Sequence, residues 1–300
     1  MSFNSLMTLL VRSLVDLLDD NPSVIELGNQ TFKPGDTALK TVIRRSEAHT
    51  RIDRDSLKKL LRLTAEERRD KTAEYYRCLG FVEYRAIDAN EKYGSLVMDL
   101  NKDLKNDYRF TNVYDLVTNN GTGEHIFNQA AVFQNMHNMT AKNGIMVHVM
   151  PFLNYINHGF YSFHPNLYFA LTGVNHYRLI ALGVAHRGGY GVIAEPDHTT
   201  EALGPCLLEE RRIALSTLLE EAKFGGKGLF GSLNGRRRFF LKLVKGNRLN
   251  DIVNALVRRY GRILVFAAMR KLEDKAFQFP FQTIYTDTIS DVRIRREYGV

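Results

Sequence analysis

The sequence predicts an α/β fold with a doubly wound, mostly parallel sheet, an antiparallel edge strand and a helical lid insertion. Short apolar runs recur along the chain without polar alternation, which is typical of strands buried on both faces of a sheet. Segments with the apolar spacing of helices separate these runs. Several runs end in an acidic residue or a glycine, at the edge where open α/β sheets bind ligands. We expect residues 1–300 to form a single domain.

The first elements are expected to be a helix, a strand and a helical insertion. Leucines at helical spacing predict an N-terminal helix within residues 1–20, and the lack of a basic leader argues against a signal peptide. Residues 23–28 are rich in apolar residues and end in Gly28, which predicts a buried strand and a tight turn. The charged, helix-patterned residues 36–78 indicate a solvated lid inserted after this strand.

Strands and helices then alternate. Residues 126–139 have helical spacing, and Pro151 is expected to close the strand that follows them. Residues 188–234 are expected to form surface excursions, and 277–285 to return beside the last strand as the antiparallel edge. The predicted strands are residues 84–88, 95–99, 114–118, 144–149 and 262–268.

The composition is that of a folded chain. Of 300 residues, 44% are hydrophobic and 25% are charged, and only 7 are proline and 22 glycine, which excludes a disordered or collagen-like chain. No apolar run approaches the ~20 residues of a transmembrane helix. The two cysteines, Cys78 and Cys206, are too few for a disulfide framework and favour the reducing cytoplasm.

Three acids end predicted strands near one edge of the sheet: Glu26, Asp88 and Asp99, with Gly28 beside them. A carboxylate such as Asp88 can accept hydrogen bonds from both hydroxyls of a ribose, and Asp99 can accept one from a purine amine. Aspartate is also an ordinary turn and cap residue, so each acid alone fits a structural role equally well. Together they predict a crevice lined with hydrogen-bond acceptors.

A family resemblance begins at the fourth predicted strand. The run YDLVTNNGTGEHIFN at residues 114–128 resembles the fourth-strand segment of class I S-adenosylmethionine-dependent methyltransferases, especially a bacterial methyltransferase-like group with a Gly-Thr-x-Glu-His signature. Residues 144–148 are similar to the family's fifth strand, and 157–161 to the segment beyond it. The resemblance covers about residues 20–30 and 80–185, and loosely 262–285.

This resemblance implies a Rossmann-like methyltransferase fold with S-adenosyl-L-methionine as the cofactor. Asp88 matches the ribose-binding acid that ends the family's second strand, and Asp99 matches the residue near the adenine. Residues 24–28 are similar to the first-strand motif that holds the cofactor's amino-acid portion. The implied cofactor-binding residues are Glu26, Gly28, Asn29, Asp88, Asp99, Leu100, Asn119 and Gly121.

Two features depart from the family pattern. The first loop, residues 28–31, has one glycine and two amides, Asn29 and Gln30, where the family has two or three glycines that let the backbone approach the cofactor. The amides either hydrogen-bond the cofactor or obstruct its pocket. Glu26 and Asp88 are also 62 residues apart, a spacing that the helical insertion accounts for.

Methyl transfer to a hydroxyl or amine needs alignment, exclusion of water and removal of a proton. His125 and His158 follow predicted strands among turn residues and are the candidate bases, because imidazole titrates near neutral pH. Tyr161 is a candidate for shaping the acceptor pocket or donating a hydrogen bond. His148 lies mid-strand and is expected in the core.

No metal site is predicted. Glu124, His125, His137 and His148 are close in sequence, but their spacing matches no His-Glu-x-x-His or facial-triad pattern. The chain also contains no nucleophile-elbow motif and no phosphate loop of the Gly-x-x-x-x-Gly-Lys type.

The net charge of +8 is unevenly distributed. Residues 211–300 carry 19 Lys+Arg and 8 Asp+Glu, a charge of +11, so the first 210 residues carry −3. The basic helical extension, residues 205–260, includes Arg236 to Arg238 beside two phenylalanines, a pattern compatible with nucleic acid. The same stretch also has the pattern of amphipathic helices with solvated bases, so nucleic acid is a partner that we do not favour.

The sequence therefore predicts an S-adenosylmethionine-dependent methyltransferase acting on a small-molecule or glycan-type (carbohydrate-type) acceptor, with histidine-assisted direct transfer. A homo-oligomer is compatible with this prediction. The alternative is a non-catalytic protein on the same fold that binds RNA or a protein partner through its basic C-terminal region.

Overall fold

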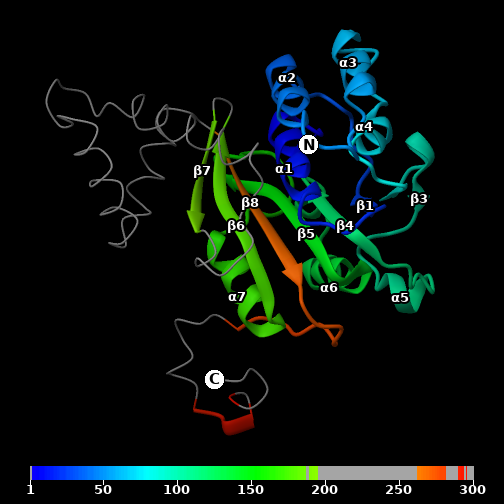
Figure 1. The fold of residues 1–300 in the computed structure, drawn as a ribbon. Coiled ribbons are helices and arrows are strands. Elements are labelled where there is room, and N and C mark those ends of the chain that lie inside the picture. The colour runs from blue at the N-terminus through cyan, green and yellow to red at the C-terminus, as the bar shows by residue number, and fades with distance from the viewer. Residues whose placement is uncertain (1, 187–188, 195–261, 282–289, 294, 296–300) are drawn as a thin grey trace, which may run out of the picture.

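The computed structural model describes residues 2–186, 189–194, 262–281, 290–293 and 295. Its strands are β1 (Ser23–Leu27), β2 (Glu83–Asp88), β3 (Leu96–Val97), β4 (Tyr114–Asn120), β5 (Thr140–Leu153), β6 (Tyr177–His186), β7 (Gly189–Ala194) and β8 (Ile263–Lys271). They form one sheet in the order β3-β2-β1-β4-β5-β8-β6-β7 (Figure 1).

The sheet confirms the predicted fold class. Strands β3, β2, β1, β4 and β5 pair in parallel, β8 is antiparallel to both β5 and β6, and β7 is an antiparallel edge strand. The edge differs from the one expected at 277–285. Because β8 already has a neighbour on each side, no edge remains beside it; residues 277–281 form no strand, and 282–285 lie outside the described residues.

Helices cover both faces of the sheet (Figure 1). One face carries α1 (Ser5–Val15), α2 (Asp36–Arg45), α3 (Arg54–Arg62) and α4 (Thr72–Cys78), and the other carries α5 (Leu104–Asp107), α6 (Gln129–Met139) and α7 (Pro165–Asn175). Neighbouring strand residues point to opposite faces, so Val24 packs with the α1–α4 layer and Ile25 with α6 and α7. The sheet is therefore doubly wound.

The predicted insertion at 36–78 is helical, but it contributes to the core. In α3 only Leu57 and Leu60 are buried, on one side of an otherwise charged helix. Tyr75 and Tyr76 of α4 are fully buried in the same apolar cluster as α1 and the sheet. The insertion therefore forms part of the core, and none of these residues lines the crevice described below.

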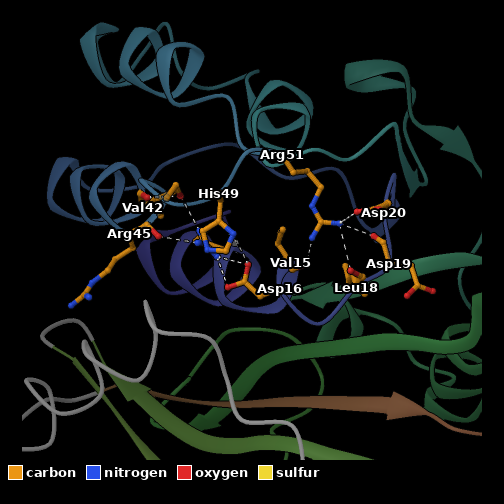
Figure 2. A network of polar contacts seen from close by, with 11 residues as sticks. Val15, Asp16, Leu18, Asp19, Asp20, Val42, Arg45, His49 and Arg51 are labelled. Carbon is orange, nitrogen blue, oxygen red and sulfur yellow. Dashed lines mark hydrogen bonds and ion pairs between the residues drawn. The ribbon is translucent and has the colours of Figure 1, made fainter.

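A buried arginine joins this insertion to α1. Arg12 has no exposed side-chain surface and donates from Nη1 to both carboxylate oxygens of Asp16, at 3.0 and 2.9 Å. Its Nε donates to Ser46 Oγ and its Nη2 to the carbonyl of Arg45, both at 2.9 Å, at the C-terminal end of α2. His49 Nδ1 also lies 3.4 Å from Asp16 Oδ1 (Figure 2).

A second arginine caps the end of α1. Arg51 donates to the carbonyls of Val15 and Asp19, each at 2.7 Å (Figure 2). The last carbonyls of a helix have no partner within it, and a cation there also complements the helix dipole. The segment between α2 and α3 thereby holds the C-terminus of α1, which ends at Val15 and not near residue 20.

Strand β5 continues to Leu153 through Pro151, where the sequence predicts its end. Proline lacks the N–H that a central strand needs. Strand β4, however, ends at Asn120, which pairs with Val149, so Pro151 lies beyond the last β4 partner. On the other side β5 keeps its antiparallel partner, with Pro151 opposite Leu264.

None of the described helices has the length and apolar character needed to cross a bilayer.

Replacing Arg12 with methionine tests the link between α1 and the insertion. Arg12→Met keeps the apolar stem but removes the Arg12 donors from Asp16, Ser46 and the Arg45 carbonyl, so we expect a loss of about 3 kcal/mol in the free energy of unfolding. Urea denaturation followed by far-UV circular dichroism measures it. Lys40→Met, on the exposed side of α2, is the control, and we expect it to change stability by less than about 0.5 kcal/mol. Equal effects of both substitutions would contradict the structural role of Arg12.

Candidate active site

A crevice opens at the carboxyl ends of the parallel strands. The chain leaves β1 toward β2 and β3 on one side and returns to β4 on the other side of β1, which creates a topological switch point (Figure 1). A cavity of about 370 Å³ lies there. Its walls come from the loops that follow β1, β2, β3 and β4: residues 28–30, 88–89, 98–101 and 121, 122, 125 and 126.

Gly28 closes β1 in a conformation that only glycine adopts readily. Its φ is +76°, and its N–H donates to the carbonyl of Ile87 at 2.7 Å. A Cβ on this residue would lie 2.2 Å from Thr122 Oγ1, which itself donates to the carbonyl of Leu27 at 2.7 Å. Gly28 is therefore required both by its backbone angle and by the close approach of the loop after β4.

Asp88 ties the first two loops together at the cavity wall. One carboxylate oxygen accepts the N–H of Asn29 at 2.9 Å, and the other accepts the backbone N–H and the side-chain amide of Asn90, at 3.2 and 2.7 Å. Each carboxylate oxygen has two lone pairs, so the half-buried carboxylate keeps acceptor capacity for a ligand hydroxyl. The sequence-predicted Asp88 lies in the predicted place.

The two amides of the first loop do not fill the cavity. The Asn29 amide donates to the side chain of Asn90 at 2.8 Å and to Ser95 Oγ at 3.2 Å. Gln30 is buried, and its Oε1 accepts from the Asn120 amide at 3.2 Å. Both residues line the cavity, while the Asn29 amide nitrogen and Gln30 Oε1 are hydrogen-bonded to protein partners.

The loop after β3 supplies the opposite wall. Asp99 is exposed and accepts the backbone N–H and the amide of Asn101, both at 2.9 Å, and these hydrogen bonds lower the pKa of the Asp99 carboxyl. Leu100, which is buried, lies next to it in the lining with Met98 and Ile126. An ionised acceptor beside apolar side chains suits a flat, amine-bearing ring.

Glu26 and Asn119, which were expected to contact the cofactor, do not line the cavity. The two-residue period of β1 directs Glu26 to the same face as Val24, where its carboxylate accepts the hydroxyls of Tyr76 and Tyr84, each at 2.9 Å. Asn119 closes the turn after β4 by accepting the N–H of Gly123 at 2.9 Å. Gly121 does line the cavity, as predicted.

The environment of Glu26 changes its protonation. Complete burial raises the pKa of this carboxyl from 4.5 to about 7, although the hydroxyls of Tyr76 and Tyr84 act in the opposite direction. Strand β1 thus carries a buried acid, Glu26, that titrates near neutral pH.

The sequence-predicted bases meet at the far end of the crevice. His125 lines the cavity with 47% of its side chain exposed, and its ring lies 4.9 Å from the ring of His158. Between them lies Glu124, which is fully buried and places Oε1 3.7 Å from His125 Nε2 and 3.3 Å from His158 Nε2. Burial lowers the pKa of His125, opposed by the charge of Glu124 and aided by His158.

The two residues that follow His158, Gly159 and Phe160, also pack against Glu124. Gly159 has φ +69°, and a Cβ there would lie 2.7 Å from Glu124 Cγ. The N–H of Phe160 donates to the Glu124 carbonyl at 2.7 Å. The contact between Glu124 and His158 has no local signal in the sequence, because 34 residues separate the two. The only nearby indication is that Glu124 and His125 are adjacent.

Tyr161 lies beside this cluster. Its hydroxyl donates to the carbonyl of Phe127 at 2.9 Å, and its ring packs with Phe127 and Phe160, which are 72% and 68% exposed. Two other histidines of this region, His137 and His148, are in the core. Burial lowers the pKa of His148 to about 3, and the pKa of His137 falls to about 4 for the same reason. Neither belongs to the cluster around Glu124. His148 was expected in the core.

Some residues of the cavity wall were not among the predicted cofactor-binding residues. Thr122 and Asn101 lie there, in loops whose polar residues look like ordinary turn residues in sequence. Residues 205–260, including Arg236 to Arg238, lie outside the described residues.

Comparisons with known proteins found similar structures but no similar sequences. No family model matches the chain, and no curated protein matches it. Among solved structures, it is similar to a SAM-dependent methyltransferase from Archaeoglobus fulgidus, with 11% identity, a TM-score of 0.44 and coverage of 89% of this chain and 93% of the other. An O-methyltransferase of a trans-AT PKS multienzyme of Brevibacillus brevis, solved with S-adenosyl-L-homocysteine, shares 10% identity, with a TM-score of 0.37 and coverage of 87% and 71%. Coclaurine N-methyltransferase shares 12% identity, with a TM-score of 0.38 and coverage of 89% and 72%.

Gly28→Ala tests the contact between the loops after β1 and β4. Gly94 is the matched control, because its φ is +72° and a Cβ there would meet no atom within 4 Å. We expect Gly94→Ala to cost about 1 kcal/mol of stability from the backbone angle alone. Gly28→Ala should cost at least about 2 kcal/mol more, since Thr122 must rotate and lose its hydrogen bond to Leu27. Equal urea midpoints for the two variants would show that the loops separate without penalty.

Glu26→Gln tests the buried carboxyl. Because the pKa of Glu26 rises from 4.5 to about 7 on folding, the folded chain binds more protons than the unfolded chain in that window. Its stabilising contribution is complete below about pH 4.5 and is lost as pH rises through about 7, by on the order of 3 kcal/mol. Unfolding measured from about pH 5 to about pH 8 should show a decline in wild type that is flatter in Glu26→Gln. Parallel pH profiles would contradict the shifted pKa.

Proposed function

We propose that this chain is an S-adenosyl-L-methionine-dependent methyltransferase that acts on a small-molecule or carbohydrate-type acceptor. One observation carries the proposal: the glycine that ends β1, the acid that ends β2 and the histidine after β4 line a single cavity at the switch point of the sheet. A cytoplasmic location belongs to the proposal, on the ground of the cysteine content.

The residues of the crevice fit the parts of that cofactor. Asp88 keeps lone pairs for ribose hydroxyls, and Asp99 with Leu100 offers an acceptor and an apolar wall to the adenine. Gly28 and Asn29 present the loop backbone to the amino-acid portion, and Gly121 lies opposite on the β4 side. When bound, the cofactor supplies a methyl group on an electron-poor sulfonium.

The protein's own contribution to transfer lies at the His125 end of the cavity. His125 and His158 assist by drawing a proton from the acceptor's hydroxyl or amine, and Glu124 holds both imidazoles from below. The exposed rings of Phe127 and Phe160, with Tyr161, offer an apolar surface next to these imidazoles for the body of the acceptor.

Asp88→Ala tests cofactor binding directly. Glu91→Ala removes one negative charge from the same loop at an exposed residue that does not line the cavity. Calorimetric titration should give micromolar S-adenosyl-L-methionine binding for wild type and Glu91→Ala. We expect Asp88→Ala to weaken it at least about 30-fold, because two charge-assisted hydrogen bonds are lost. No heat and no thermal shift of wild type at millimolar cofactor would reject the proposed function.

The alternative, a non-catalytic protein that binds RNA or a protein partner, depends on the basic residues 205–260. It predicts RNA affinity that falls steeply with salt concentration and depends on Arg236 to Arg238. Fluorescence anisotropy with mixed-sequence RNA at two salt concentrations distinguishes it. Absence of RNA binding together with cofactor binding would leave the methyltransferase.

A further inference from the structure

The cluster at the end of the crevice has the composition of a metal centre. Within the described residues, Glu124, His125 and His158 are the one group of three whose potential ligand atoms all lie within 4.8 Å of one another. Two imidazoles and one carboxylate is the ligand set of catalytic zinc sites and of non-haem iron sites. We propose that these three residues bind a divalent first-row transition cation.

The distances suit such a cation. Ligand atoms about 2.1 Å from a metal and about 90–110° apart are separated by roughly 3.0–3.4 Å. Glu124 Oε1 lies 3.3 Å from His158 Nε2, within that range, and 3.7 Å from His125 Nε2, which needs only a small rotation of a half-exposed ring.

The charge at the cluster favours a cation. Glu124 has no exposed surface, and within the described part of the chain its Oε2 has no hydrogen-bond partner. A buried carboxylate without full compensation is costly, and a bound cation at its other oxygen offsets that cost. Nearby Tyr168 is also fully buried, and its hydroxyl has no partner among the described residues.

Backbone contacts position the three proposed ligands without a bound metal. His125 directly follows Glu124 in the 3-10 turn η2 (Gly123–His125), and the Phe160 N–H fixes the Glu124 carbonyl to the segment that carries His158. Gly159 permits this approach, since any Cβ there would collide with Glu124. Both imidazoles remain partly exposed, at 47% and 28%, so the open side of the site faces solvent and the cavity.

This inference deepens the proposed function, on which its catalytic role rests. With a cation bound, an acceptor hydroxyl that reaches it is polarised and its pKa falls. The imidazoles then act as ligands of the cation, in place of the direct proton removal proposed above. The proton passes to solvent, the acceptor oxygen forms the new bond to the methyl carbon, and the electrons of the broken carbon–sulfur bond remain on sulfur.

Direct metal titration tests the site. The full-length, untagged chain is freed of metal, titrated with Zn²⁺ by calorimetry and with Co²⁺ by visible absorption, and its metal content is measured by mass spectrometry. We expect one equivalent with a Kd in the micromolar range or tighter. His158→Ala and Glu124→Gln should each weaken binding at least about 100-fold. His176→Ala is the control, because it removes a histidine 3.6 Å from an acid, Glu273, outside the three-ligand group.

The outcomes separate the two proposals. Wild-type affinity weaker than about 100 μM, or equal binding by wild type and both ligand variants, overturns the cation site, even when S-adenosyl-L-methionine binds normally. Loss of cation binding in His176→Ala equal to that in His158→Ala also overturns it. Cation binding that depends on Glu124 and His158 in a chain that does not bind S-adenosyl-L-methionine supports the site and rejects the proposed function. Circular dichroism verifies folding, and His158→Ala, at a partly exposed residue, keeps the test decisive if Glu124→Gln does not fold.

Discussion

The close approach of Thr122 to Gly28 is the contact on which the crevice depends. It joins the ends of β1 and β4 at the point where the sheet's connections diverge, and it leaves no space for a side chain at residue 28. Asp88 extends the same constraint to the neighbouring loop by accepting the N–H of Asn29. These hydrogen bonds fix the relative positions of the loops that line the 370 Å³ cavity.

The helical insertion and the sheet both donate hydrogen bonds to one buried carboxyl, that of Glu26. Glu26 lies in an apolar cluster and is satisfied by one tyrosine from α4 and one from β2. Burial of an acid is unfavourable when it is ionised, so the fold gains most from Glu26 when it is protonated. The insertion is anchored at its other end by Arg12 and Arg51, which tie it to α1. The helical insertion is therefore tied both to the sheet and to α1.

The cluster of Glu124, His125 and His158 is built from two segments that meet only in the folded chain. Glu124 and His125 lie in the turn after β4, and His158 lies in the segment after β5. Gly159 lets that segment pack closely against Glu124. The buried carboxylate of Glu124 lies close to both imidazoles. The exposed rings of Phe127 and Phe160 lie next to this cluster.

Local pattern in the sequence was sufficient for the strands β1, β2, β4 and β5, for Gly28, and for Asp88 and Asp99 at the strand ends, because burial and turn geometry act over a few residues. It did not predict β6 and β7, or that β8 would insert between β5 and β6, since pairing partners are chosen across long loops. The orientation of Glu26 away from the cavity followed from the pleat of β1 in its final register. The meeting of Glu124 with His158 was likewise decided only by tertiary structure, because no local signal spans the 34 residues between them.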